Sequence, residues 1–306
     1  MHRRSFGHEF RKNKWLFVMI APAVAYFLVF FYFPMAGSYM AFTSYDLVKG
    51  IFKSPFVGLE NFKFLYISGI LAKITMNTIL YNVAFILVGG AFQISAAIFI
   101  SELAGKSFKK LTQSMMFLPY FVSYVLIGVF VYQFFNYEHG TLNGILKALH
   151  MDPVDVFSNV GIWKYIIVFF SVWKGLGFGM IIYLATIMGI NNEINEAAEI
   201  DGASIFQRIR YITIPLIIPT FITLLLLSVG SILKGQLDLF YQITGNNGLL
   251  FDATEVVDTY VFRALLNARD YGLVSAAGFY QSSFGFVLVL IANYLVKKYD
   301  RDYGLF

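Results

Sequence analysis

The sequence has no cysteine and few charged residues among its 306 positions. Without cysteine, disulfides and thiolate metal sites are excluded. Charged residues make up 13% of the chain, whereas a soluble globular domain carries about 25%. Most of the surface therefore cannot face water. The histidines, His2, His8, His139 and His150, all lie outside the apolar runs, so no metal site is expected.

What the chain does have is apolar length, because 58% of its residues are hydrophobic. A helix that crosses a bilayer core needs about 20 apolar residues. Runs of that length cover residues 15–36, 75–102, 113–135, 163–189, 213–232 and 272–296. The first run is too long for a signal-peptide core and lacks the small residues of a cleavage site, so we expect it to be retained. The predicted fold class is an all-α integral membrane protein with six transmembrane helices.

The basic residues predict the orientation. Lysine and arginine are denser in the N-terminal segment, in residues 103–112 and 190–212 and in the C-terminal tail than in the alternate loops. Such enrichment is typical of the cytoplasmic side, so both termini are predicted to be cytoplasmic. No loop is long enough for its own core. This leaves a cytoplasmic basic segment, 1–14, and a single transmembrane domain, 15–306. The basic segment is expected to be either an interfacial helix or a frayed tail that only sets topology.

One polar stretch, residues 191–215, interrupts the chain between the fourth and fifth runs. Asn192 is suited to cap a first helix. Gly202 ends that helix and supplies a turn. Ser204 and Gln207 have the spacing of a capping box for a second helix. The sequence therefore predicts two short surface helices about Gly202.

The first of these helices has a distinctive face. Ala197, Ala198 and Ala203 are small enough for another backbone to approach closely, and Glu196 and Glu199 share a side. A surface helix of this kind suits a groove in a partner protein. An ordinary amphipathic connector fits the same residues equally well.

The run from Glu196 to Ala203, followed by Phe206, Pro215 and Pro219, resembles the EAA loop of ABC-importer permeases. Further resemblances to the carbohydrate-uptake branch, and most of all to LplB-like polysaccharide and oligosaccharide permeases, lie in Gly58–Phe62, Asn77–Thr78, Trp173–Phe178, Asp258–Tyr260 and Tyr271–Gln281. The resemblance covers nearly the whole chain. It implies the type I ABC-importer permease fold in a bacterial-type cell membrane.

In that family the EAA loop is a coupling helix that enters a cleft of an ATP-binding subunit. The resemblance places this loop near residues 190–213. The residues that it assigns to coupling are Glu196, Ala197, Ala198, Asp201 and Gly202. It also implies two cytoplasmic ATP-binding subunits per complex, a second permease subunit that is expected to be a different chain, and an extracytoplasmic solute-binding protein. No nucleic acid partner is expected.

The chain lacks a phosphate-binding loop of its own. Gly105-Lys106-Ser107 matches the end of such a loop, but Ile100 stands where the earlier glycine is required, and an apolar run rather than a strand precedes it. We therefore expect a transport subunit that is not an enzyme, with no catalytic residue and no cofactor. ATP and magnesium would bind to the partner ATPase.

Lys174, in the middle of the fourth run, is the clearest ionisable residue within a predicted span. One hypothesis places Lys174 and Trp173 on the solute path, where Lys174 binds hydroxyls or an acidic sugar. The alternative is that Lys174 pairs with a neighbouring acid or snorkels. Gln133 and Gln281 are further candidates for the path, although such residues more often join helices.

Proline and glycine mark places where the spans are expected to bend or pack closely. Gly175, Gly177 and Gly179 permit close packing or a loosened helix. Pro22 and Pro119 should kink the first and third spans, facing either a cavity or packed side chains.

Loop 233–271 is the largest of those predicted to lie outside. It contains a helix candidate near 254–267, with Asp252 and Glu255 in capping-box spacing. The resemblance implies that this loop helps to dock the binding protein. A solvated re-entrant connector is the alternative.

Together with this resemblance, the sequence predicts a permease subunit of a binding-protein-dependent ABC importer. It would move an oligosaccharide or polysaccharide-derived solute into the cytoplasm by alternating access. An ion-gradient-driven secondary transporter is the alternative, and it is disfavoured because no carboxylate lies in the middle of a predicted span.

Overall fold

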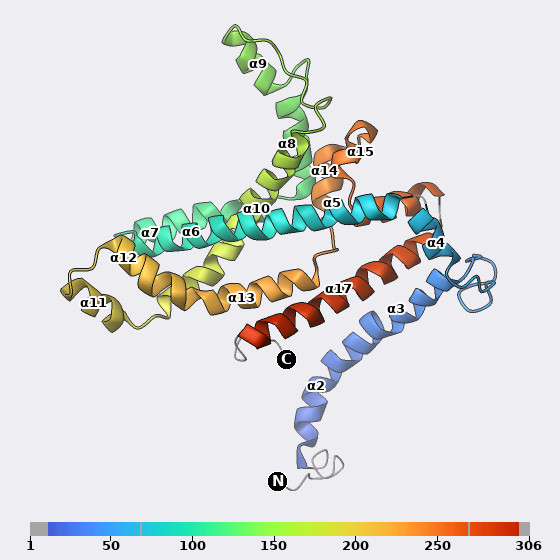
Figure 1. Ribbon diagram of the computed structural model, residues 1–306, viewed down its shortest axis with the longest axis horizontal. Helices are drawn as coiled ribbons and strands as arrows, with labels where there is room; N and C mark the ends of the chain where they lie inside the picture. The colour runs from blue at the N-terminus through green and yellow to red at the C-terminus, as the bar shows by residue number, and fades with distance from the viewer. Residues whose placement is uncertain (1–11, 68, 269, 300–306) are drawn as a thin grey trace. The chain divides into compact units, whose positions relative to one another are not determined.

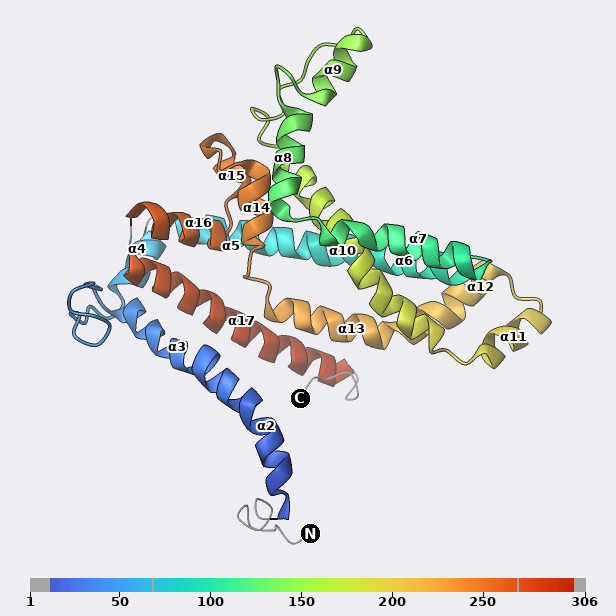
Figure 2. The same ribbon diagram turned by 180° about the vertical axis from the view of Figure 1, so that it is seen from behind.

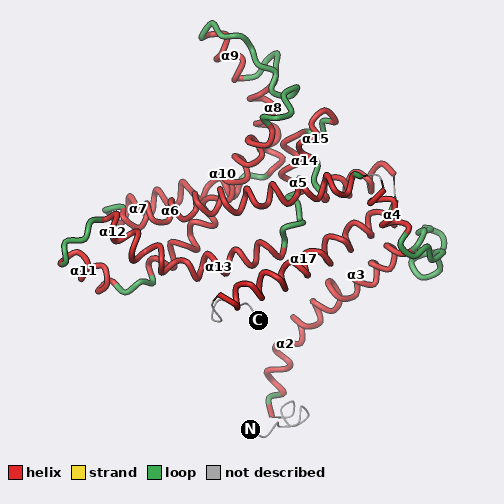
Figure 3. Tube along the Cα trace, in the orientation of Figure 1, coloured by secondary structure: helices red, strands yellow, loops and turns green. Residues whose placement is uncertain are grey.

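The computed structural model of the chain describes residues 12–67, 69–268 and 270–299. Within these ranges the regular structure is helical and there is no strand, as Figure 3 shows. The predicted interfacial helix in segment 1–14 lies almost entirely outside the described residues. The all-α fold class is therefore confirmed for the part of the chain that the structure describes.

The chain divides into two compact units. The first comprises Met1–Ile67 and Ala264–Phe279, and the second comprises Ser68–Arg263 and Tyr280–Phe306. Each is described by itself.

In the first unit, one continuous helix forms the first span. Its consecutive parts are α2 (Lys14–Phe27), the π-helical η1 (Leu28–Tyr32), α3 (Phe33–Met35) and the 3₁₀-helical η2 (Ala36–Phe42). The helix runs through Pro22 without a break and continues past the predicted end at residue 36. This unit also contains α4 (Glu60–Ile67), the π-helical η7 (Ala264–Ala268) and the beginning of α17 (Tyr271–Tyr299). Asn61 joins α4 to the end of the span by donating to the carbonyls of Ala41 (2.9 Å) and Thr43 (3.1 Å).

The second unit contains the rest of the spans. Its first helices are α5 (Ile70–Ala84), π-helical η3 (Phe85–Gly89), α6 (Gly90–Glu102), α7 (Lys106–Phe117), 3₁₀-helical η4 (Leu118–Phe121), α8 (Tyr124–Phe135), α9 (Thr141–Ala148) and α10 (Trp163–Met188). They are followed by α11 (Asn192–Ile200), α12 (Ile205–Arg208), π-helical η5 (Ile209–Thr213), α13 (Ile214–Gly230), α14 (Leu237–Thr244), 3₁₀-helical η6 (Gly248–Leu250), α15 (Phe251–Thr254) and α16 (Val257–Arg263).

Among the described residues, five helices are long and apolar enough to cross a membrane: Lys14–Phe42, Ile70–Glu102, Trp163–Met188, Ile205–Gly230 and Tyr271–Lys298. They include five of the six predicted spans.

The kink predicted at Pro119 is confirmed and amounts to a break: the third predicted span, 113–135, is not one continuous helix, because Lys106–Phe121 and Tyr124–Phe135 meet at 90°. Pro119 lies in the tight turn η4 and has no backbone N–H to donate. Ser123 then caps α8 by accepting a hydrogen bond from the backbone N–H of Leu126. Counted together as one broken span, the two halves bring the candidate spans among the described residues to six.

Helix α10 is the central element of the second unit. It packs along α6, and both Figure 1 and Figure 2 show it crossing between α6 and α13. Trp163 at its start is fully buried, and its indole Nε1 donates to the carbonyl of Val156 at 2.9 Å. Gly177 lies so close to α7 that an added methyl group would collide with backbone atoms of Met116 and Phe117. The close packing predicted for the glycines of this span is confirmed at Gly177.

Candidate functional site: the coupling loop and the polar cavity

The polar stretch between the fourth and fifth spans contains α11 at one extremity of the second unit, beyond α7 and α12 (Figure 1). Asn191, rather than the predicted Asn192, caps this helix, because its side chain accepts a hydrogen bond from the backbone N–H of Glu193 at 3.1 Å. Gly202 follows with φ of +78°, a backbone conformation that favours glycine. The N–H of Ala203 closes the turn on the carbonyl of Ala198 at 2.9 Å. The predicted turn at Gly202 is confirmed.

The second predicted helix begins as expected. Ser204 and Gln207 form a complete capping box, in which each side chain accepts from the other residue's backbone N–H. This helix is not a separate short one, however. It continues through η5 and past Pro215 as the fifth span, Ile205–Gly230. Proline near the beginning of α13 is tolerated because the wider π turn precedes it. The loop is therefore one surface helix joined by a glycine turn to a span.

The residues that the EAA resemblance assigns to coupling lie on or next to α11. Glu196, Ala197, Asp201 and Gly202 are exposed, and Ala198 is half-buried. Two apolar side chains that were not predicted as part of the site accompany them, Ile200 at 87% exposed and Phe206 at 83% exposed. Both could have been recognised in the sequence, because each is a large apolar side chain in an otherwise polar stretch. Exposed apolar groups beside carboxylates suit a protein partner rather than water.

One basic residue ties α11 to the spans. The guanidinium of Arg208 contacts the carboxylate of Glu199 on α11, and its Nη2 lies 3.6 Å from Oε2 of Glu102 at the end of α6. Glu199 and Glu102 come from elements far apart in the sequence. No local pattern in the sequence predicts this arrangement.

Lys174 lies on α10 opposite the break in the third span. Its ammonium donates to the carbonyl of Tyr120 at 2.7 Å and to the carbonyl of Val122. It also lies 4.9 Å from the centre of the Tyr124 ring. A broken helix leaves carbonyls without their usual N–H partners, and Lys174 satisfies two of them. The expected pairing of Lys174 with an acid is not observed among the described residues.

A cavity of about 380 Å³ adjoins Lys174. Its polar lining consists of amide, hydroxyl and ammonium groups from Asn82, Gln93, Tyr120, Tyr124, Ser171, Lys174, Ser228, Ser231 and Gln236. Some of these groups already bond to one another: Tyr124 donates to Oε1 of Gln236 at 3.0 Å. No carboxylate is among the lining residues. The kink at Pro119 was expected to face either a cavity or packed side chains. The break faces a cavity, because Tyr120 and Tyr124 line it.

The other candidates for the solute path lie elsewhere. Trp173 lines a separate groove of about 710 Å³, formed mostly by apolar side chains of α5, α6 and α10. Gln133 is exposed on α8 and lines neither cavity. Gln281 donates to the carbonyl of Leu233 at 2.8 Å and to the carboxylate of Asp258 at 3.2 Å. The structure does not bring these residues together with Lys174.

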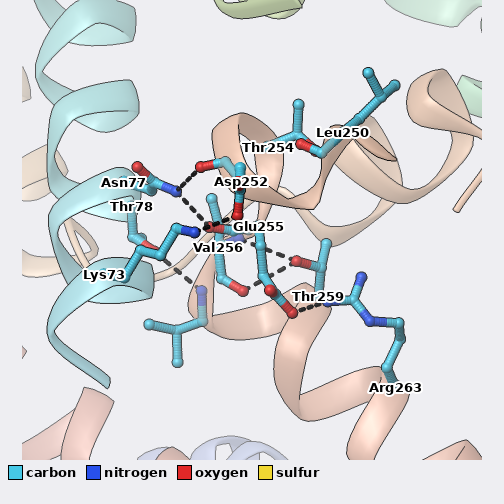
Figure 4. Close-up of polar contacts among 11 residues, drawn as sticks. Lys73, Asn77, Thr78, Leu250, Asp252, Thr254, Glu255, Val256, Thr259 and Arg263 are labelled. Atoms are coloured by element: carbon cyan, nitrogen blue, oxygen red, sulfur yellow. Dashed lines mark hydrogen bonds and ion pairs between the residues drawn. The ribbon is translucent and has the colours of Figure 1, made fainter. Parts of the chain in front are cut away.

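At the other end of the second span, polar side chains of α5 hold the segment around α15 and α16 (Figure 4). Asn77 donates to the carbonyls of Asp252 (3.4 Å) and Glu255 (3.1 Å). Thr78 accepts from the backbone N–H of Val257 at 3.0 Å. The Asn77–Thr78 pair, noted in the sequence only as part of a resemblance, thus fastens this loop to the second span.

The capping box predicted for Asp252 and Glu255 was wrong, whereas the helix predicted near 254–267 is present with a later start, as α16 followed by η7. Each carboxylate instead takes a basic partner, Lys73 for Asp252 and Arg263 for Glu255. Thr259 accepts from the backbone N–H of Val256 at 3.1 Å, so α16 begins only at Val257. Ion pairing and a threonine cap compete successfully with the expected local bonds.

A half-buried carboxylate secures the same loop. Asp258 of α16 accepts from the backbone N–H of Gly235 and from Gln281. Burial raises the pKa of Asp258 above its ordinary value, while these hydrogen bonds act in the opposite direction. The aspartate of the Asp258–Tyr260 run therefore holds two segments of the loop together.

Five candidate spans, a bent pair of helices beside a polar cavity, and an exposed capped helix before the fifth span suit a membrane permease. Residues 89–301 match the family described as "Binding-protein-dependent transport system inner membrane component". The chain belongs to this family and is an inner membrane component of an ABC importer.

Relatives of similar length support this assignment. The chain is 31% identical to Protein LplB of Bacillus subtilis, covering 97% of this chain and 92% of that protein. It is 28% identical to the polygalacturonan/rhamnogalacturonan transport system permease protein YteP of the same organism, covering 95% and 90%.

A solved structure has the same fold. It is a bacterial alginate ABC transporter in complex with an alginate pentasaccharide-bound periplasmic protein, and one of its chains matches with a TM-score of 0.86 at 29% identity over 96% of this chain and 98% of that chain. The predicted type I permease fold and membrane location are confirmed.

Proposed function

We propose that this chain is the permease subunit that moves an oligosaccharide or polysaccharide-derived solute into the cytoplasm by alternating access. Energy would come from ATP hydrolysis on a separate subunit and enter through the loop 191–213. The observation that carries this proposal is the exposed helix α11, capped at Asn191 and ended by the glycine turn at Gly202. A capped helix on the surface, joined directly to a span, suits the transmission of movement.

The coupling residues would be Glu196, Ala197, Ala198, Asp201 and Gly202. In this proposal α11 enters a cleft of the ATP-binding subunit. The small side chains of Ala197 and Ala198 allow close approach, and the exposed Ile200 and Phe206 supply apolar contact. Two ATP-binding subunits would hold ATP and magnesium, and this chain would hold neither. The end of the molecule that bears α11 would lie in the cytoplasm.

A saccharide cargo is supported by the names of the relatives and by the cavity beside Lys174. YteP is described as a polygalacturonan/rhamnogalacturonan permease, and the solved relative transports alginate. Amides, hydroxyls and tyrosine rings line the cavity of this chain. Such groups match the hydroxyls and C–H faces of a sugar. The solute path would pass this cavity, with Lys174 on its wall.

The proposed partners complete the transporter complex. An extracytoplasmic binding protein would deliver the solute, and a second permease subunit would form the other half of the path. One coupling loop per chain matches one ATP-binding subunit per permease.

The proposal is tested by purifying the chain with its ATP-binding subunits and second permease and placing the complex in vesicles. The binding protein presents a labelled uronate-containing oligosaccharide on one side of the vesicle membrane. Its uptake should require ATP on the opposite side, where the ATP-binding subunits lie. The contrasting measurement uses ATP-free vesicles with a proton or sodium gradient. Uptake under that condition, without ATP, would instead favour the ion-gradient-driven transporter.

A further inference from the structure

Arg208 is the only described residue through which α11 forms an ion pair. It lies at the end of α12, where the chain turns into the fifth span. Nη1 of its guanidinium contacts the carboxylate of Glu199 of α11, and Nη2 lies 3.6 Å from Glu102, the last residue of α6. Three elements thus meet at one side chain: the surface helix, the fifth span and the second span.

The chemistry of this contact favours a fixed geometry. The side chain of Arg208 is 15% exposed, compared with 36% for Glu102 and 57% for Glu199. Partly buried charges are screened by salt less than exposed ones. A guanidinium has several N–H groups in a rigid plane and can therefore serve two carboxylates at once, which a single ammonium does less well.

Within the described residues, the other hydrogen bonds that tie α11 to its surroundings go to the loops at its two ends. The loop toward the fifth span contains Gly202, whose neighbours leave open space around it. A helix held only by such loops would tilt about the glycine turn when a partner pushed it. The bond from Arg208 to Glu199 opposes that tilt, and the bond to Glu102 brings the second span into the same assembly.

We propose that Arg208 is a positioning residue that clamps the coupling helix to the second span. Through this clamp, movement of α11 reaches the second span as well as the fifth span, to which α11 is joined by the chain. The proposal rests on the coupling role of α11 given above. It assigns a role to Arg208, Glu102 and Glu199, none of which is among the residues to which the resemblance assigns coupling.

The chain offers a matched control two residues away. Arg210 is exposed, lies 5.8 Å from the centre of the Tyr211 ring, and has no carboxylate partner among the described residues. Arg210→Gln removes the same charge from the same surface without touching the clamp.

The test uses the complete complex in vesicles and measures solute taken up per ATP hydrolysed. In Arg208→Gln this ratio should fall roughly tenfold, within the usual range of coupling between sites, while basal ATP hydrolysis and assembly persist. Glu102→Gln, which keeps the bond to Glu199, should lower the ratio in the same direction. Arg210→Gln should stay within about twofold of the unmodified complex, as expected for a surface change.

A distance measurement separates the clamp from a general loss of stability. Because the chain has no cysteine, nitroxide labels can be attached at Asn192→Cys and Lys106→Cys alone. The distance distribution between α11 and the start of α7, which follows α6 in the chain, should broaden in Arg208→Gln and not in Arg210→Gln.

An unchanged uptake ratio in Arg208→Gln and Glu102→Gln, or an unchanged distance distribution, would overturn the proposal. If Arg208→Gln does not assemble, the ratio in Glu102→Gln decides. Failure of the proposed function is distinct, because the unmodified complex would then show no ATP-dependent uptake.

Discussion

At the scale of single residues, the charge of Lys174 is held by backbone rather than by another side chain. Two carbonyls at the break of the third span accept hydrogen bonds from its ammonium. A cation placed where a helix ends also meets the negative end of the helix dipole. Lys174 therefore stabilises the break, and any contact with solute would be made by its remaining N–H.

Replacing Lys174 with methionine should show this structural role. The variant Lys174→Met keeps the length of the side chain but leaves the carbonyls of Tyr120 and Val122 without donors. Hydrogen bonds to charged groups contribute about 1.5–3 kcal/mol each, so the unfolding temperature of the purified complex should fall by several degrees.

The control is Lys164→Met, at the exposed start of the same helix. Equal unfolding temperatures for the two variants would show that the break does not depend on Lys174. Unchanged uptake and solute preference in Lys174→Met would remove Lys174 from the solute path.

At the scale of elements, the length of the apolar runs predicts the spans. The break in the third span depends instead on contacts of individual side chains, which the length of a run does not reveal. Five predicted spans have close counterparts, because burial in lipid requires about 20 apolar residues in sequence. Pro119 signalled a bend, but its 90° angle depends on the cap at Ser123 and on Lys174, which lies far away in the sequence.

The candidate site shows the same division. The glycine turn and the capping box were predictable because all their partners lie within a few residues. The contact of Arg208 with Glu102 and the contacts of Asn77 with residues 252 and 255 join distant parts of the chain. Local patterns do not reveal such contacts, and the capping box predicted at Asp252 failed because Lys73, from the second span, and Arg263, eight residues beyond Glu255, paired with its two carboxylates.

Packing between α7 and α10 gives a prediction at this scale. Gly177→Ala places a methyl group against the backbone of Met116 and Phe117, which cannot move as a side chain can. Overpacking of this kind costs about 1–3 kcal/mol, so the two helices should separate and the unfolding temperature of the purified complex should fall.

Gly175→Ala is the matched control, because the nearest atom to its added methyl group, Nε2 of Gln93, is 3.9 Å away. A thermal unfolding curve for each variant makes the comparison. Equal curves would mean that α7 yields at this point without cost.

At the scale of the whole molecule, the second span joins two sets of contacts. It comprises 33 residues, about 50 Å of helix at 1.5 Å per residue, which exceeds a bilayer core of about 30 Å. Its first turns hold the loop around α15 and α16 through Asn77 and Thr78. Its last residue, Glu102, meets Arg208. The helix thus connects the loop around α15 and α16 at one end with Arg208, and through Arg208 with α11, at the other.

The π turn at Phe85–Gly89 has a consequence for the rotational phase of this span. Both ends keep their partners only if they face fixed directions around the helix axis, and each residue turns an α-helix by about 100°. A π turn holds one residue more than an α turn, so it takes up an extra residue while the phase of both ends is preserved.

Deletion of Leu87, within the π turn, should therefore leave an ordinary α-helix and an active complex. Deletion of Phe99, beyond it, should turn Glu102 away from Arg208 and lower uptake per ATP. Both side chains are exposed to a similar extent, 61% and 58%, so lost packing should affect both deletions alike. Equal effects of the two deletions would mean that the rotational phase of the span does not matter to coupling. If the effects differ as expected, the π turn is the place where the length of the span can change while the side chains at its two ends keep their directions around the helix axis.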